Sequence, residues 1–230
     1  RDPQTLRALA DVGLNIARFN FSHADYEQTG KTLGYVRQLQ EEGYIISTLL
    51  DTKGPEIRTG DLDEPVSYER GEEFKLVVDA AKKDSEKTIL CDYEFLLEDV
   101  EVGQKVIIDS GLFRVEVKEK HDDYVLVEAL NKATIKSRRH INLPGMILRL
   151  PAITEKDKKD LLFGIDQKMD FVAISFIRSA ENVREVREFL DANGGEHMHI
   201  IAKIENQEGV DNLEEIVIEV DAVMTARGDL

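Results

Sequence analysis

Cysteine and tryptophan are nearly absent from this sequence: its 230 residues contain one cysteine, Cys91, and no tryptophan. A single cysteine excludes an internal disulfide framework and a zinc site built from cysteine ligands. It is typical of a protein in a reducing compartment, so we expect a cytoplasmic location. No apolar run approaches the roughly 18 residues that a membrane-spanning helix needs. The sequence also lacks a signal peptide and begins with Arg1 instead of methionine, so we expect a piece of a longer protein.

Basic residues are too few to balance the acidic ones. The chain has 30 lysines and arginines against 46 aspartates and glutamates, which gives a net charge of -16. Because a chain with this negative charge repels nucleic acids and anionic lipids at long range, we expect neither nucleic acid nor a membrane as a partner. Capture of an anionic small molecule requires a local cationic or metal site. The remaining composition, 42% apolar and 33% charged, is that of a globular protein with one or two domains.

Strand-like and helix-like patterns alternate in the two outer parts of the chain. Strand patterns occupy five ranges: 15–22, 44–51, 170–177, 199–205 and 221–226. Helical spacing of apolar residues occupies five others: 5–13, 25–43, 155–167, 180–192 and 207–216. Strands separated by helices are usually parallel, so this order predicts an α/β barrel or a doubly wound sheet. Between residues 58 and 147, short strand-like runs and acidic turns predict an all-β insert.

Polar residues collect at the expected ends of these strands, where parallel α/β sheets place ligand sites. Arg18, Asn20 and Ser22 share one face of the first strand, and a buried guanidinium there requires an anion beside it. The second strand ends at Asp51 and Thr52, whose oxygens suit a cation. Each group has a plain alternative: a hydrated strand tip for the first, and a crossover turn with surface charges for the second.

The fourth and fifth predicted strands also end in charged residues. Lys203 and Glu205 are two residues apart, so they face the same way. They form either a buried salt bridge or half of a site for a metal and a phosphate. After the fifth strand, Gly228 permits close backbone approach and Asp229 supplies a second carboxylate. Two carboxylates together with phosphate oxygens make a magnesium site.

Six segments, in this order and spacing, resemble the pyruvate kinase family. They are RFNFSH (18–23), LDTKGPEIRTG (50–60), NLPG (142–145), SFIRSAENV (175–183), KIENQEGVDN (203–212) and ARGDL (226–230). The resemblance covers essentially the whole chain. It implies a TIM (β/α)8 barrel that a small all-β lid domain interrupts after the third strand. It also implies transfer of the phosphoryl group of phosphoenolpyruvate to ADP, which gives pyruvate and ATP in glycolysis.

The same resemblance implies a division of the chain. Residues 1–57 hold the second and third barrel strands, residues 58–147 form the inserted lid, and residues 148–230 hold the fourth to sixth strands. Two more strands and a C-terminal domain would follow Leu230, so we expect an open barrel and an inactive chain when it stands alone. The full-length form is expected to be a homotetramer that binds phosphoenolpyruvate and ADP.

The resemblance also implies a role for each matching residue. The catalytic cations are Lys203, against the transferring phosphoryl group and the enolate, and Arg18, against the substrate phosphate. Substrate contacts are Arg18, Lys203, Ala226, Arg227, Gly228 and Asp229. Nucleotide-phosphate contacts are Asn20, His23, Arg58 and Arg139, the last in a place where the family usually has lysine. Mg²⁺ (or Mn²⁺) has the ligands Glu205 and Asp229, and K⁺ has the oxygen ligands Asn20, Ser22, Asp51 and Thr52. Glu56 implies K⁺ dependence, since family members that dispense with K⁺ tend to carry lysine there.

Two other functions stay open at this point. A Mg²⁺-dependent barrel lyase also presents acidic metal ligands at its strand ends, although the β insert and the LDTKGPEIR loop argue against it. The chain is alternatively a non-catalytic fragment or binding module. An assay with phosphoenolpyruvate and ADP, with and without the two cations, separates these functions.

Overall fold

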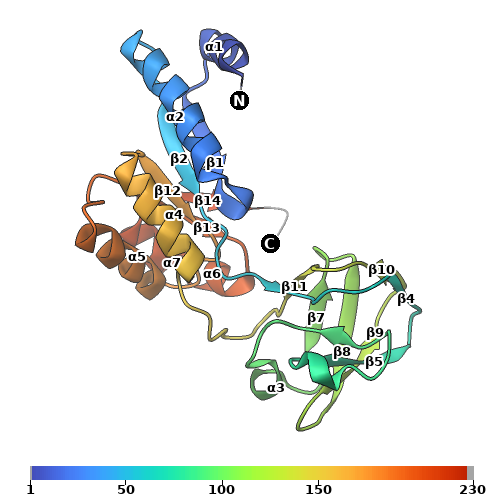
Figure 1. Cartoon of the computed structure of the whole chain (residues 1–230). Helices are drawn as coiled ribbons and strands as arrows, with labels where there is room; N and C mark the ends of the chain where they lie inside the picture. The colour runs from blue at the N-terminus through green and yellow to red at the C-terminus, as the bar shows by residue number, and fades with distance from the viewer. Residues whose placement is uncertain (1, 227–230) are drawn as a thin grey trace.

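A five-stranded sheet forms one part of the molecule, and the computed structural model describes residues 2–226 (Figure 1). The strands lie in the order β1 (Ile16–Asn20), β2 (Ser47–Asp51), β12 (Phe171–Ile174), β13 (His199–Ile204) and β14 (Ala222–Thr225). All neighbouring pairs are parallel. The spatial order follows the chain order without a reversal, as in a barrel, whereas a doubly wound sheet reverses at a switch point. The structure therefore favours the barrel over the doubly wound alternative.

Helices connect these strands and bury one face of the sheet. They are α1 (Pro3–Asp11), α2 (Tyr26–Glu41), α4 (Glu155–Asp166), α5 (Ala180–Ala192), α6 (Gln207–Asp211) and α7 (Leu213–Glu219). In α5, Val183 and Val186 are buried at helical spacing, and they belong to the same apolar cluster as Ile200 and Ala202, alternate residues of β13. The two periods, 3.6 for the helix and 2 for the strand, put both sets of side chains into one core. Among residues 2–226, no helix has both the length and the apolar character to cross a lipid bilayer.

Several predicted boundaries are wrong for local reasons. The first strand ends at Asn20, because the Asn20 side chain accepts a hydrogen bond from the Ser22 backbone N–H at 2.9 Å and the chain enters the short helix η1 (Phe21–His23). Ser22 is therefore on a turn and does not share a strand face with Arg18. The helix predicted over 207–216 is two helices, α6 and α7, which meet at Asn212. The Asn212 side chain donates to the Arg178 carbonyl at 2.8 Å and so fixes this break.

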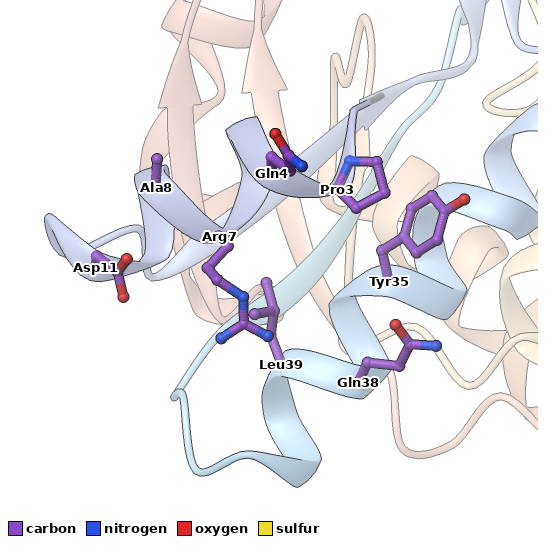
Figure 2. Close-up of a pocket in the computed structure, with 8 residues that line it drawn as sticks. All are labelled: Pro3, Gln4, Arg7, Ala8, Asp11, Tyr35, Gln38 and Leu39. Carbon is purple, nitrogen blue, oxygen red and sulfur yellow. The ribbon is translucent and has the colours of Figure 1, made fainter.

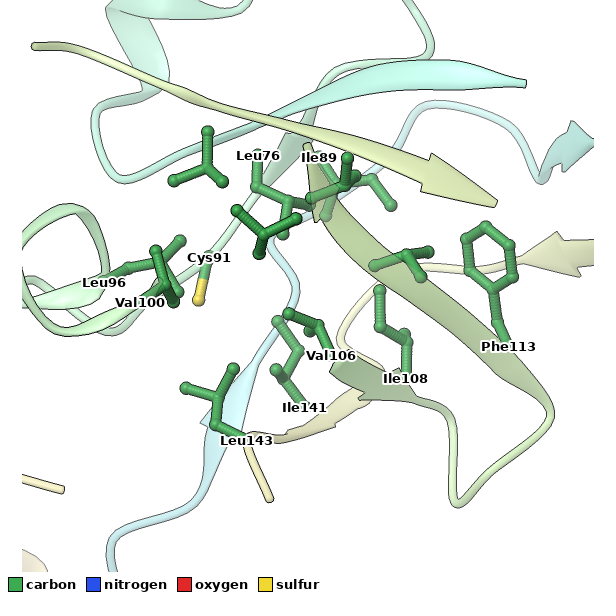
Figure 3. Close-up of a cluster of buried hydrophobic side chains, with 14 of the residues drawn as sticks. Leu76, Ile89, Cys91, Leu96, Val100, Val106, Ile108, Phe113, Ile141 and Leu143 are labelled. Carbon is green, nitrogen blue, oxygen red and sulfur yellow. The ribbon is translucent and has the colours of Figure 1, made fainter. Parts of the chain in front are cut away.

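The middle of the chain forms a separate group of strands, away from the five-stranded sheet in Figure 1. A seven-stranded sheet has the order β3 (Ile57–Arg58), β11 (His140–Asn142), β7 (Lys105–Ile108), β8 (Phe113–Lys120), β9 (Val125–Ala129), β5 (Glu73–Val77) and β6 (Ile89–Leu90). A two-stranded sheet pairs β10 (Ala133–Ile135) with β4 (Val66–Tyr68), and two short helices are η2 (Ala80–Lys82) and α3 (Leu96–Asp99). Alternate strand residues, such as Val106 and Ile108 of β7, point into a buried apolar core (Figure 3).

Candidate active site

A polar cleft of about 200 Å³ opens at the carboxyl ends of the first four strands of the parallel sheet. Seven residues predicted from the sequence line it: Arg18, Asn20, Ser22, Asp51, Thr52, Lys203 and Glu205. Strand register brings them together, because Asn20 pairs with Asp51, and Asp51 pairs in turn with Ala173 of β12. The cleft therefore collects side chains that lie up to 187 positions apart (205 − 18) along the chain.

The Lys203 ammonium lies between two carboxylates. Its Nζ is 3.0 Å from Asp51 Oδ1 and 3.0 Å from Glu205 Oε1, which confirms the predicted proximity of Lys203 and Glu205. The Lys203 side chain is 11% exposed, and both carboxylates are 2% exposed. Burial by itself lowers the pKa of Lys203, but attraction by Glu205 and Asp51 outweighs it and holds the pKa above its usual value. The two carboxylates therefore favour the charged form of Lys203.

Asp51 is the anion that the Arg18 guanidinium requires. Arg18 Nε donates to Asp51 Oδ2 at 2.6 Å, and a terminal guanidinium nitrogen contacts the same oxygen. The Arg18 side chain remains 51% exposed, because β1 lies at the edge of the described sheet. The expectation of a buried guanidinium is thus wrong. A half-exposed guanidinium beside the cleft keeps donors that can meet an anionic ligand.

Glu205 is held by a backbone group in an unusual conformation. The Phe176 N–H donates to Glu205 Oε2 at 2.8 Å. Phe176 has a φ of 58°, a left-handed conformation that is strained for a bulky side chain and persists only where its surroundings enforce it. Phe176 also lines the cleft. The turn after β12 therefore aims a backbone donor at the Glu205 carboxylate.

The loop after β2 is fixed against helix α4. Gly54 has a φ of 73°, and a Cβ there would lie 2.7 Å from Ser175 Cβ, so the position admits only glycine. The Gly54 N–H donates to Asp157 Oδ1 at 3.1 Å. The other carboxylate oxygen of Asp157 closes a capping box with Thr154 at the start of α4. One buried carboxylate thus ties the helix to the loop that begins at Thr52, directly after Asp51.

Sequence reasoning missed Ser175, which lies at the centre of this network. The Lys203 ammonium donates to Ser175 Oγ at 2.7 Å, and Ser175 Oγ donates to the Thr52 carbonyl at 2.7 Å. The Ser175 N–H donates to Thr52 Oγ1 at 3.0 Å. In the sequence, Ser175 lies inside the range predicted as a strand (170–177) and opens the SFIRSAENV segment, and neither feature assigns a role to its hydroxyl.

Four predicted residues lie outside this cleft, and three others lie outside the described residues. His23 is exposed on η1. Arg58 is on β3, where its Nε donates to Glu56 Oε2 at 2.8 Å, and Glu56 lines the cleft. Arg139 is 3.7 Å from Asp109, on the strand group of the middle segment. Ala226 follows β14, and its N–H donates to the Ile204 carbonyl at 3.2 Å. The three residues outside the described ones are Arg227, Gly228 and Asp229.

The donor set of the cleft suits hard cations. Asn20, Ser22, Asp51 and Thr52 carry side-chain oxygens and line the same cleft, and oxygen ligands are those that K⁺ and Mg²⁺ prefer. Asp51 Oδ1 is buried without a hydrogen-bond partner of good geometry. Within residues 2–226, no group of three or more His, Cys, Asp or Glu side chains is arranged to hold a metal ion. A divalent ion at Glu205 would therefore need further oxygens from outside this set, such as those of a substrate or of water.

A second hollow, of about 260 Å³, lies between α1 and α2 (Figure 2). Arg7 points into it and pairs with Glu42 at 2.6 Å. Its α2 residues, among them Tyr35 and Leu39, belong to the part of the helix that leads to the start of β2. The hollow is therefore at the amino-terminal edge of the sheet, which in barrels serves stability and not catalysis.

Comparison with known proteins supports the same interpretation. A family profile described as "Pyruvate kinase, barrel domain" matches residues 1–230. A pyruvate kinase of Geobacillus stearothermophilus is 43% identical over 226 residues, covering 96% of this chain and 38% of the relative. Pyruvate kinases of Clostridium perfringens and Eimeria tenella are 41% and 42% identical, over 99% and 100% of this chain and over 48% and 44% of their own lengths. The chain thus spans less than half the length of these relatives.

Proposed function

Because the chain belongs to the pyruvate kinase family, we propose that it carries the phosphoryl-transfer site of an enzyme that moves the phosphoryl group of phosphoenolpyruvate to ADP. The products are pyruvate and ATP. One observation carries the proposal: the Lys203 ammonium lies 3.0 Å from both Asp51 and Glu205 in a cleft at the ends of parallel strands. A fixed cation at this place is what the transfer of a phosphoryl group between two anions requires.

Lys203 and Arg18 neutralise charge on the substrate. Arg18 binds the phosphate from the exposed side of the cleft, while Lys203 faces the phosphoryl group in transfer and the enolate that is left. Because negative charge moves between these oxygens during the reaction, a cation held in place lowers the barrier without having to reorganise. The net charge of -16 repels both substrates at long range, and this cationic pair offsets the repulsion locally.

The remaining roles follow the family resemblance. The backbone at 226–228 binds the substrate carboxylate. The segment 58–147 acts as an inserted lid that closes on the nucleotide and excludes water, which otherwise competes with ADP. The nucleotide phosphates are bound by Asn20, His23, Arg58 and Arg139.

Two cations complete the proposed site. Glu205 and Asp229 hold Mg²⁺ or Mn²⁺, and Asn20, Ser22, Asp51 and Thr52 hold K⁺. When bound, the divalent ion neutralises phosphate oxygens and orients the substrate. The chain's own contribution is to hold and aim the Glu205 carboxylate, through the Phe176 N–H and the Lys203 ammonium. Glu56 leaves the monovalent site without a lysine, so K⁺ dependence is part of the proposal.

The setting of the enzyme is also proposed from the family. A homotetramer in the cytoplasm is the assembly and location that we propose. Matching relatives include a plastidial pyruvate kinase of Arabidopsis thaliana, 38% identical over 96% of this chain. Cell fractionation therefore tests the proposed cytoplasmic location against a plastidial one.

A coupled assay tests the function. The protein expressed from its whole gene, and the 230-residue chain by itself, are each assayed with phosphoenolpyruvate and ADP. We expect the whole-gene protein to form pyruvate, to lose activity when Mg²⁺ is chelated, and to lose most of it when K⁺ is replaced by tetramethylammonium. Absence of phosphoryl transfer under all these conditions would refute the proposal. Cleavage of a carbon–carbon bond in a malyl or oxaloacetate substrate would instead support a barrel lyase, and ligand binding without turnover would support a binding module.

A further inference from the structure

We propose that Ser175 is a positioning residue of the phosphoryl-transfer site. Its hydroxyl holds the Lys203 ammonium at a fixed position relative to the loop after β2. The inference rests on the proposed function. Ser175 is buried, and its hydroxyl is the bridge between Lys203 Nζ and the Thr52 carbonyl, at 2.7 Å to each. An ammonium only donates and a carbonyl only accepts, so the single hydroxyl proton must point to Thr52. The direction of both hydrogen bonds is therefore fixed.

Two carboxylates also hold Lys203, since Asp51 Oδ1 and Glu205 Oε1 each lie 3.0 Å from its Nζ. Asp51 Oδ1 is 3.0 Å from Nζ but has no hydrogen bond of good geometry. Charge attraction falls off slowly with distance and angle, whereas a hydrogen bond weakens steeply when it is misaligned. The Ser175 hydroxyl, at 2.7 Å from Nζ, consequently adds a directional contact on the side of the loop after β2.

Close packing keeps the Ser175 side chain in place. Gly54 approaches so closely that a Cβ would meet Ser175 Cβ at 2.7 Å. The Ser175 N–H is anchored on Thr52 Oγ1 at 3.0 Å. The next residue, Phe176, holds Glu205 by its own N–H. Two consecutive residues after β12 thus fix the ammonium of Lys203 and the carboxylate of Glu205.

The test compares Ser175→Ala with a matched control, Thr48→Val. Thr48 is buried at the opposite end of β2, where its hydroxyl donates to Asp170 Oδ2 at 2.8 Å and accepts from the Asp170 N–H at 3.0 Å. Each variant therefore removes one buried hydroxyl that makes two hydrogen bonds. Both are made in the protein expressed from its whole gene. We measure the melting temperature, kcat, KM for phosphoenolpyruvate, and crystal structures of the parent and of Ser175→Ala.

We expect Ser175→Ala to lower kcat about 10- to 100-fold, as misplacement of a reacting group does, while KM changes less than about twofold. Thr48→Val should lower the melting temperature similarly and leave kcat within about twofold. In the crystal structure of Ser175→Ala, Lys203 Nζ should have left its position between Asp51 and Glu205. Ser175→Cys keeps a side chain of similar volume but offers a weaker hydrogen-bond acceptor. Its kcat should lie between those of Ser175→Ala and the parent. It replaces Ser175→Ala in the test if that variant does not fold.

Two results overturn the inference: a kcat loss no larger than that of Thr48→Val, or an unmoved Nζ in the structure of the variant. If the unsubstituted protein transfers no phosphoryl group, the proposed function fails, and the position of Nζ alone decides the role of Ser175.

Discussion

Lys203 and Gly54 show how single residues of the cleft are constrained. Lys203 keeps its charge because the attraction of Glu205 and Asp51 exceeds the effect of burial on its pKa. Gly54 has no side chain because both its backbone conformation and the space beside Ser175 exclude one. The first residue contributes charge to the site, and the second contributes close packing. Substitution of Lys203 should therefore affect mainly the rate, whereas substitution of Gly54 should affect stability as well.

Lys203→Met should lower turnover sharply while substrate binding survives. The ammonium acts mainly on charge that develops as the phosphoryl group moves, so we expect kcat to fall about 100- to 1,000-fold. Kd for phosphoenolpyruvate, measured by calorimetry, should change only a few-fold. Lys31→Met is the control, because Lys31 pairs with Glu27 on the surface of α2 and should leave both quantities unchanged. Equal losses of binding and rate would instead make Lys203 a structural partner of Glu205.

Gly54→Ala should destabilise the protein and slow turnover together. The positive φ contributes about 1–2 kcal/mol of strain, and the contact with Ser175 adds about 1–3 kcal/mol. Gly71→Ala is a matched control, since Gly71 has a φ of 82° but no atom within 4 Å of its added Cβ. It should show the strain alone and keep kcat. Urea unfolding and the coupled assay measure both effects, and equal stabilities of the two variants would contradict the close approach to Ser175.

At the scale of elements, the start of α4 connects helix stability with the site. The capping box of Thr154 and Asp157 satisfies backbone groups at the first turn. The same Asp157 carboxylate accepts the Gly54 N–H of the loop after β2. Helix and loop therefore share one buried side chain, and its two contacts can be separated by substitution.

Thr154→Ala and Asp157→Ala should differ in activity. Thr154→Ala removes one side of the capping box and should lower the free energy of unfolding by about 1 kcal/mol, with kcat unchanged. Asp157→Ala also frees the Gly54 N–H, which stays buried and unpaired, so it should cost about 2–3 kcal/mol and lower kcat about tenfold. Urea denaturation and the coupled assay separate the two. If both variants keep the kcat of the parent, the contact between α4 and the loop does not contribute to turnover.

At the scale of the whole molecule, the apolar residues form separate cores. The core of the middle segment contains residues between Ile57 and Met146 only, whereas the clusters under the parallel sheet contain none of them. Cys91 is fully buried in the first of these cores (Figure 3). Its thiol can therefore report on this core separately from the sheet that carries the cleft.

Ile108→Ala should expose Cys91, and Val186→Ala should not. Each substitution empties space in one core and should lower local stability by about 1–5 kcal/mol. The rate at which Cys91 reacts with a thiol reagent, measured in low urea at pH 8, should rise several-fold for Ile108→Ala. It should stay at the parent rate for Val186→Ala, which lies in the core under the sheet. Equal rates for the two variants would mean that the cores unfold as one unit.

Alkaline pH should destabilise the middle segment through the same thiol. Burial raises the pKa of Cys91 to about 12, while the unfolded thiol titrates near its ordinary value of about 8.5. Since the folded pKa is the higher one, this stability is fully present below about pH 8.5 and is lost as pH rises toward 12. The urea midpoint of the parent should therefore fall more steeply than that of Cys91→Ala between pH 8 and 10. Parallel pH profiles would contradict this linkage.

The sequence by itself determined the order of the elements and most of the cleft. Periods of 2 and 3.6 residues are local properties, so the alternation of strands and helices, the pairing of Lys203 with Glu205, and the polar ends of the strands were all predictable. The motifs of residues 18–23, 50–60 and 203–212 carry the family resemblance without any knowledge of the fold. The roles that the resemblance gives to Arg227, Gly228 and Asp229 stay predictions, because these residues lie outside the described ones.

Only the tertiary structure decided which groups meet. Three contacts depend on the register of strands that are far apart in sequence. Asp51 pairs with Arg18, and Ser175 bridges Lys203 and Thr52. Phe176 adopts a left-handed backbone conformation and holds Glu205. Local patterns carry no information on that register, because it is set when the strands pair and the core packs as a whole.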